Sequence, residues 1–151
     1  MDPNTISLIT CITAAISALI AGISAYLAYR FKRADGKAEL EKELDRILEI
    51  GIQYPRFEYE PFTSDWVNHR GEDNDIYLRY DIYCNLLFNF LHHVFEYYDG
   101  KKEKIENYVD VRTWIRMHRQ NWEHPVADNE NVDGYDPKLL WLITQPLFPV
   151  V

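Results

Sequence analysis

The chain has 151 residues and a formal net charge of −8 at pH 7. That length is enough for one domain, and the acidic balance argues against a nucleic-acid partner because phosphate binding needs clustered Lys and Arg. The two cysteines, Cys11 and Cys84, both lie in apolar segments, so a disulfide framework is not expected. We expect the domain to lie in a reducing compartment.

The strongest pattern lies near the N-terminus, after the short segment 1–5. Residues 6–29, ISLITCITAAISALIAGISAYLAY, contain no charged side chain. A helix of this length rises about 36 Å, which is enough to cross a hydrocarbon core of about 30 Å with some tilt. A cleaved signal peptide usually has a basic start and a shorter apolar core, whereas this chain starts MDPNT. The pattern predicts a retained transmembrane helix.

The charges beside this span predict its orientation. Four basic side chains follow it closely: Arg30, Lys32, Arg33 and Lys37. Only Asp35 opposes them, and no Lys or Arg precedes the span. By the positive-inside rule, the N-terminus should be outside and the C-terminal domain cytoplasmic, which predicts a single-pass protein of the inner (plasma) membrane. Tyr26 and Tyr29 stand where interfacial aromatic residues are expected.

The span also carries small residues at a spacing of four. They form two ribbons on a helix: Ala14, Ala18 and Gly22 on one, and Ser17, Ala21 and Ala25 on the next. Such ribbons let two helix backbones approach closely, which favours association in lipid. We expect a homo-oligomer, with chance alignment of common small residues as the alternative.

Residues 30–53 follow as a juxtamembrane amphipathic helix that Pro55 ends. Its apolar face carries Leu40, Leu44, Ile47 and Leu48. We expect it to pack on the domain, either continuous with the span or hinged at Gly36. The many acids weaken the alternative of a helix lying in the membrane interface.

A compact helical cytoplasmic domain is expected over residues 54–151. It begins with an aromatic-rich segment, residues 54–75, whose prolines and lack of period predict an ordered irregular connection packed on the core. A binding surface is the alternative for these aromatic residues.

The central helix of this domain contains RYDIYCNLLFNFLHHVFEYYDG, residues 79–100, with Asp75 as its expected N-cap and Gly100 as its stop. Its polar stripe lies within an arc of about 80° on a helical wheel. The stripe consists of Asp81, Asn85, Asn89, His92 and Glu96. We interpret it as a partly buried structural strip, with partner binding as an alternative.

A further helix is expected over residues 103–122, where apolar side chains and His118 recur at helical spacing. His118 lies in line with Ile115 and Trp122, as a hydrogen-bonded core histidine would. An acidic loop over residues 123–137 and a short helix that Asp136 caps complete an all-α fold of about four helices after the span.

The order of these segments looks like a class of uncharacterised bacterial membrane-anchored helical proteins, known as domains of unknown function. The resemblance rests on the single span, the charged linker helix, the YP break, the RYDIYCNLLFNFL helix and a helix with W, H and W. It implies an architecture and no activity, so no functional residue is carried over.

Two weak site hypotheses remain. His92 and Glu96, four residues apart, could supply two metal ligands that His118 or His124 would complete, but no cysteine pair or second such repeat accompanies them. The spacing of Arg112 and His118 resembles the pair of HEPN-like ribonucleases, where a polar Asn, Asp or His usually follows the Arg; here Thr113 does. On a regular helix the two side chains point about 120° apart.

Other enzyme signatures are missing, since the chain has no Gly-rich phosphate loop and no Gly-x-Ser-x-Gly elbow. Catalysis is therefore a minority hypothesis, and no cofactor is expected. The sequence favours a membrane-anchored protein for interaction, scaffolding or sensing at the cytoplasmic face, working as a homo-oligomer or with a protein partner. A membrane-perturbing or pore-forming effector is one alternative, and a ribonuclease is the other.

Overall fold

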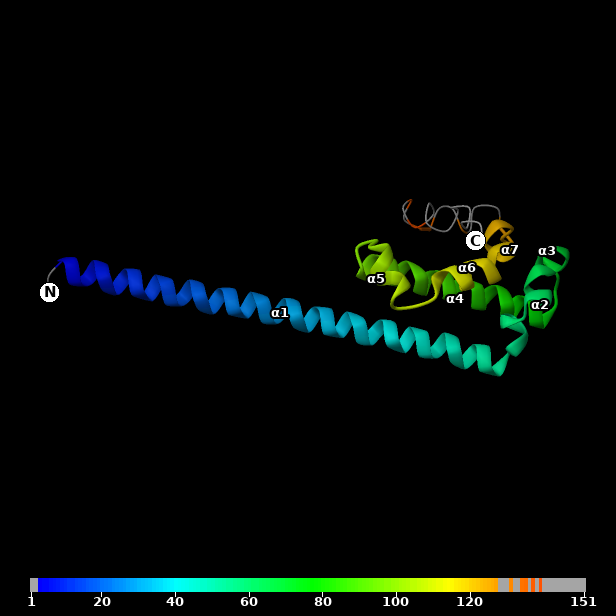
Figure 1. Ribbon diagram of the computed structural model, residues 1–151, viewed down its shortest axis with the longest axis horizontal. Helices are drawn as coiled ribbons and strands as arrows, with labels where there is room; N and C mark the ends of the chain where they lie inside the picture. The colour runs from blue at the N-terminus through cyan, green and yellow to red at the C-terminus, as the bar shows by residue number, and fades with distance from the viewer. Residues whose placement is uncertain (1–2, 128–130, 132–133, 136, 138, 140–151) are drawn as a thin grey trace. The chain divides into compact units, whose positions relative to one another are not determined.

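The computed structural model describes residues 3–127, 131, 134, 135, 137 and 139. Every regular element in these residues is a helix, which confirms the all-α prediction (Figure 1). The chain divides into two compact units, residues 1–39 and residues 40–151. The second unit contains the packed core.

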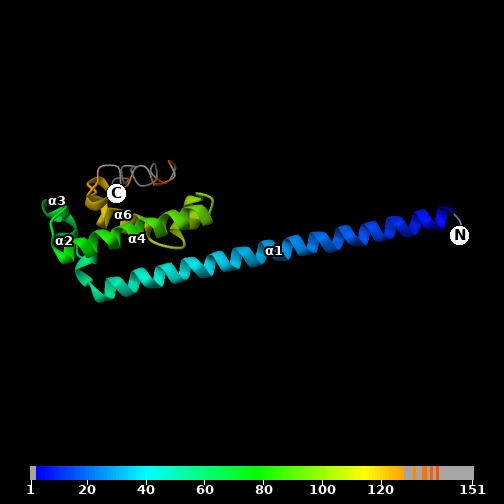
Figure 2. The same ribbon diagram turned by 180° about the vertical axis from the view of Figure 1, so that it is seen from behind.

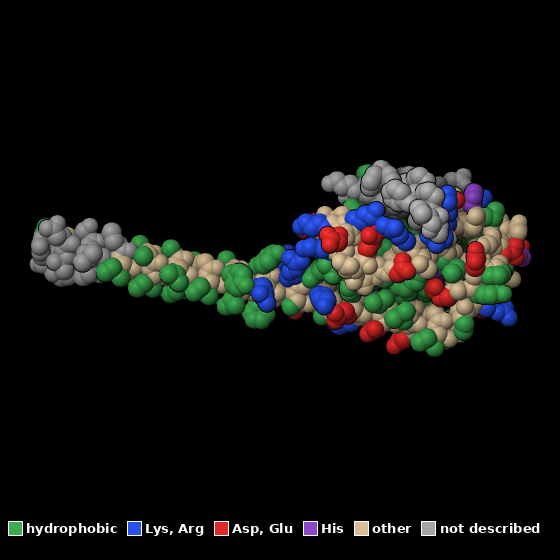
Figure 3. Space-filling model, viewed as in Figure 1, with side chains coloured by type: hydrophobic (Ala, Val, Ile, Leu, Met, Phe, Trp, Pro, Cys, Tyr) green, Lys and Arg blue, Asp and Glu red, His purple; other side chains and the backbone are tan. Residues whose placement is uncertain are grey.

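The first element, α1 (Pro3–Gln53), is one uninterrupted helix that continues through Gly36. It carries an apolar stretch long enough to cross a membrane, and none of that stretch is buried. The large apolar side chains of the stretch are exposed: Ile12, Ile16, Leu19, Ile20, Ile23 and Leu27. The green side chains along this part of α1 in Figure 3 show the same surface. The prediction of one helix of membrane-spanning length near the N-terminus is confirmed.

The C-terminal part of α1 belongs to the second unit and buries one face there. Leu40 and Ile47 are buried, and Leu44 and Ile50 pack partly against the core. Leu48 was expected on this face but is 47% exposed, because it lies about 100° round the helix from Ile47.

The segment after α1 consists of short helical turns rather than irregular backbone: η1 (Pro55–Glu58), α2 (Glu60–Ser64) and α3 (Trp66–His69). Proline stands in the first turn of both η1 and α2, where its missing N–H costs no helical hydrogen bond. Phe57 and Trp66 are buried, and the Trp66 indole donates a 2.9 Å hydrogen bond to the backbone oxygen of His124.

The central helix is α4 (Asp75–Tyr97), seen from both sides in Figures 1 and 2. Its N-cap is Asn74 and not Asp75 as predicted. The Asn74 side chain accepts a hydrogen bond from the Ile76 N–H. Eight of its side chains are buried: Tyr80, Tyr83, Cys84, Leu87, Phe88, Phe90, Leu91 and Val94. Most of them lie on the side of α4 away from the polar stripe, whereas Phe88 lies about 20° from Asp81 round the helix.

The prediction of one helix over residues 103–122 is wrong. The structure has three shorter helices there: α5 (Lys102–Glu106), α6 (Val111–Met117) and α7 (Arg119–Glu123). Asp110 starts α6 by accepting hydrogen bonds from both the backbone N–H and the hydroxyl of Thr113. His118 separates α6 from α7 with φ −103° and ψ 14°. The second unit therefore has more and shorter helices than the four expected. The helix predicted after Asp136 lies largely outside the described residues.

Candidate functional site

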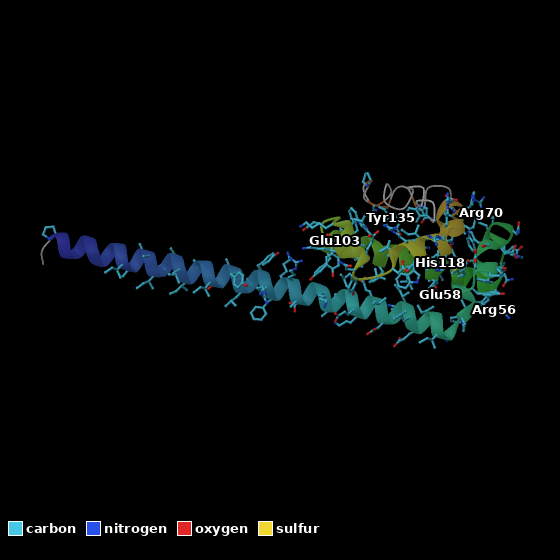
Figure 4. All side chains as sticks on the ribbon, viewed as in Figure 1. Arg56, Glu58, Arg70, Glu103, His118 and Tyr135 are labelled. Atoms are coloured by element: carbon cyan, nitrogen blue, oxygen red, sulfur yellow. The ribbon has the colours of Figure 1, made fainter. Side chains whose placement is uncertain are left out.

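A buried polar cluster surrounds His118, whose side chain is fully buried. Its Nδ1 atom lies 3.0 Å from the Tyr80 hydroxyl and 3.9 Å from the Cys84 sulfur. Its Nε2 atom lies 3.5 Å from Oε1 of Glu58, which is an ion-pair distance without a hydrogen bond. The cluster joins three parts of the chain, since Glu58 ends η1, Tyr80 and Cys84 lie on α4, and His118 precedes α7 (Figure 4).

Glu58 is the charged partner at the edge of this cluster, with its side chain about one-third exposed. Tyr83 donates a short hydrogen bond to its carboxylate. Burial raises the pKa of the Glu58 carboxyl, but the close approach of the His118 imidazole and the hydrogen bond from Tyr83 outweigh it and hold the pKa below its ordinary value. The carboxylate is therefore ionised at neutral pH.

The hydroxyls of Tyr80 and Tyr83 and the thiol of Cys84 stay protonated. Burial is the main cause that raises the pKa of the hydroxyls of Tyr80 and Tyr83 and of the Cys84 thiol. A thiol of raised pKa is a poor nucleophile, and a fully buried imidazole has no access to a substrate. The arrangement therefore fastens η1 to α4 and to the α6–α7 junction, and it does not resemble an open catalytic site.

The sequence anticipates only part of this cluster. The alignment of His118 with Ile115 and Trp122 indicates a core histidine, and the cluster places it in the core. Glu58 carries no comparable signal, because it is one acid among several in an aromatic segment. Its role depends on a contact with a residue 60 positions later, which no local pattern reports.

The polar stripe of α4 contacts a different part of the chain. Asp81 accepts a 2.9 Å hydrogen bond from the Asn121 side chain on α7, and Asn89 accepts one of 3.2 Å from the Tyr135 hydroxyl. His92 packs edge-to-face on Tyr135. These contacts of the stripe thus reach α7 and Tyr135. Asn85 also has an interaction within the chain.

The predicted metal ligands are not brought together. His92 and Glu96 approach to 3.7 Å on the stripe, whereas His118 lies in the cluster on the apolar side of α4. In the part of the chain that the structure describes, no group of three or more His, Cys, Asp or Glu side chains is arranged to hold a metal ion.

The predicted ribonuclease pair occupies two different surroundings. Arg112 lies at the surface, where its guanidinium makes a 2.6 Å ion pair with Glu106. His118 lies in the core against Tyr80. Neither side chain contacts the other in the described hydrogen bonds and ion pairs, so no shared phosphate site forms between them.

Two hollows in the second unit run between α1 and α4 and share Leu86. One, of about 360 Å3, is lined by Glu43, Arg46, Ile47, Leu86, Asn89, Phe90 and His93. The other, of about 300 Å3, is lined mainly by apolar and aromatic side chains beside Gln53 and Arg79. In the first hollow, His93 contacts the Glu43 carboxylate at 3.0 Å.

The small residues predicted for helix association are all exposed on α1, in the first unit: Ala14, Ser17, Ala18, Ala21, Gly22 and Ala25. A Cβ atom built on Gly22 would meet nothing within 4 Å. Nothing in the described chain covers these ribbons.

Comparison with known proteins gave no match: no family model matches the chain, and no curated protein or solved structure is significantly similar to it. The function must therefore be argued from the residues themselves.

Proposed function

We propose that this protein is a single-pass membrane protein that presents its acidic helical unit at the cytoplasmic face, where it serves interaction, scaffolding or sensing as a homo-oligomer. The observation that carries the proposal is the uncharged stretch of residues 6–29 within α1, whose described large side chains are exposed.

The free energy of burying this stretch in lipid is large. Each Val, Leu, Ile or Phe side chain gains about 1.5–3 kcal/mol on leaving water, so the six exposed Ile and Leu side chains together supply on the order of 10 kcal/mol. The backbone needs no partner in lipid because the helix satisfies its own hydrogen bonds. A bilayer is therefore the environment that suits this segment.

The flanking charges support the orientation. The basic residues beside the span favour the cytoplasmic side, and the chain after Lys37 is acidic. An acidic compact unit stays soluble beside the membrane. The buried cluster around His118 lacks access for a substrate, which favours binding over catalysis.

Self-association is the part of the proposal that the ribbons support. Small residues allow close backbone contact between spans, where van der Waals packing drives association. Gly22→Leu should weaken a dimer in detergent, measured by analytical ultracentrifugation, because the added side chain separates the helices. Ile23→Phe adds volume off the ribbons and serves as the control. A chain that is monomeric before any substitution contradicts self-association.

The membrane anchor is tested by fractionation after alkaline carbonate extraction. The full chain should stay in the membrane pellet, and Ile16→Lys combined with Ile20→Lys should release it, because charges near the bilayer centre cost about 2.5–3.5 kcal/mol each. Ile52→Lys, on an exposed apolar residue of the same helix in the second unit, should leave the chain in the pellet. Release of the unsubstituted chain refutes the anchor.

A further inference from the structure

The basic residues beside the span gather on one face of α1. At about 100° per residue, Tyr26, Arg30, Arg33 and Lys37 fall within an arc of about 60°. Lys32 lies about 130° from the middle of that arc, and Asp35, the only acid of residues 30–37, lies about 170° from it. We call Arg30, Arg33 and Lys37 the basic face. It is free of acids over residues 30–37, and Figure 3 shows Lys and Arg gathered along α1 beside its apolar stretch.

Two tyrosines orient the arginines of this face. Arg30 donates to the Tyr26 hydroxyl at 3.1 Å, with its guanidinium 5.9 Å from the Tyr26 ring centre. Arg33 donates to the Tyr29 hydroxyl at 3.0 Å. A guanidinium carries five N–H donors, so each of these arginines can bind more than one acceptor at a time. Restraining the side chain beforehand lowers the entropy cost of binding.

The position and charge of the face define its partner. It directly follows an uncharged stretch that ends at Tyr29, so in an inserted chain it stands at the level of the headgroups. The chain after Lys37 has 22 acids against 12 bases and would be repelled by an anionic surface. Attraction to anionic lipid therefore has to come from the residues beside the span. Arginine forks match the oxygen geometry of a phosphate.

We propose that the basic face binds the headgroup phosphate of an anionic phospholipid, with Tyr26 and Tyr29 as positioning residues. The inference rests on the proposed membrane insertion and names the lipid class that the inserted chain selects.

The test uses the full chain in bilayer nanodiscs that contain equal amounts of phosphatidylglycerol and phosphatidylcholine, with the retained lipids counted by native mass spectrometry. Phosphatidylglycerol should be enriched among them. Arg33→Gln should lower the enrichment by about five-fold, the ratio that corresponds to about 1 kcal/mol per basic residue at an anionic surface. The matched control is Lys32→Gln, which removes one charge at the neighbouring position off the basic face and should lower the enrichment less than Arg33→Gln does, because a lysine offers no guanidinium fork to a phosphate.

Two further variants separate geometry from charge. Arg30→Lys with Arg33→Lys keeps the charge but removes the forks, and Tyr26→Phe with Tyr29→Phe removes the orienting hydroxyls. Both should lower the enrichment while the chain stays inserted. Equal losses for Lys32→Gln and Arg33→Gln, or no enrichment at all, would overturn the proposal.

Insertion is scored separately in vesicles of phosphatidylcholine alone. A chain that inserts there but shows no preference for phosphatidylglycerol overturns the lipid proposal and keeps the anchor. A chain that fails to insert overturns the anchor, and the lipid proposal with it.

Discussion

At the scale of single residues, the contact of Glu58 with Tyr83 and His118 is the polar junction of the second unit. Replacing the carboxylate removes the charged acceptor of the Tyr83 hydroxyl and a negative charge beside the buried His118. Glu58→Gln should lower the free energy of unfolding at pH 7 by about 1–3 kcal/mol, measured by urea titration of tryptophan fluorescence in detergent. Glu49→Gln, on an exposed acid of α1, should change it by less than about 0.5 kcal/mol.

The contribution of Glu58 to stability depends on pH in a direction that follows from its pKa. The pKa of Glu58 is lowered in the folded chain, so its stabilising contribution is present above the ordinary carboxyl pKa of about 4.5 and is lost as the pH falls through the folded value. The difference in unfolding free energy between the unsubstituted chain and Glu58→Gln should therefore shrink on going from pH 7 to below pH 4. A difference that grows on acidification would contradict the assigned contacts.

His118 and Arg112 allow the ribonuclease alternative to be tested directly. His118→Ala should lower the unfolding free energy by about 2–4 kcal/mol, because it opens a cavity and leaves the Tyr80 hydroxyl without its partner. Arg112→Ala removes only an exposed ion pair and should cost less than about 1 kcal/mol. The ribonuclease hypothesis would be restored if the unsubstituted chain cleaves RNA and both variants lose this activity while keeping their fold.

At the scale of elements, the end of α4 is held by a left-handed turn. The Gly100 N–H bonds to the Phe95 oxygen and the Asp99 N–H to the Glu96 oxygen, which is the Schellman pattern. Asp99 has φ 53° and Gly100 has φ 67°. Gly100 was predicted to end the helix. In the structure, Asp99 occupies the position where a Schellman turn usually carries glycine.

Two substitutions test this helix end through the same urea titration. Asp99→Gly should raise the unfolding free energy by about 0.5–1 kcal/mol, because glycine adopts positive φ without steric cost. Gly100→Ala should lower it by 1 kcal/mol or more, on the order of a strained left-handed residue, since its Cβ would lie 2.9 Å from the Phe95 ring. An unchanged midpoint for both variants would contradict the described turn.

Element boundaries also show where local patterns mislead. The helical spacing of residues 103–122 hides the break at Asp110, although an Asp three residues before Thr113 is itself an N-cap signal. The spacing of the α4 stripe is visible in the sequence. Its partners, Asn121 and Tyr135, lie 40 and 46 positions away, and only the tertiary structure supplies contacts at such separations.

At the scale of the whole molecule, composition predicts the structure better than local spacing predicts element boundaries. The absence of charge over residues 6–29 predicts one long apolar helix, and α1 contains it. The alternation of apolar and polar faces predicts helices and no strands, as the described residues show. The buried cluster was beyond prediction, because Glu58 and His118 meet only once three separate segments have packed.

The central claim, a single span with the second unit on the cytoplasmic side, is tested most directly by trypsin digestion of membrane vesicles of both orientations. In inside-out vesicles, trypsin should remove the second unit and leave a membrane-embedded fragment from the apolar part of α1. In sealed right-side-out vesicles, the second unit should stay intact. The reverse pattern, or a chain that washes out of both kinds of vesicle, would contradict the account.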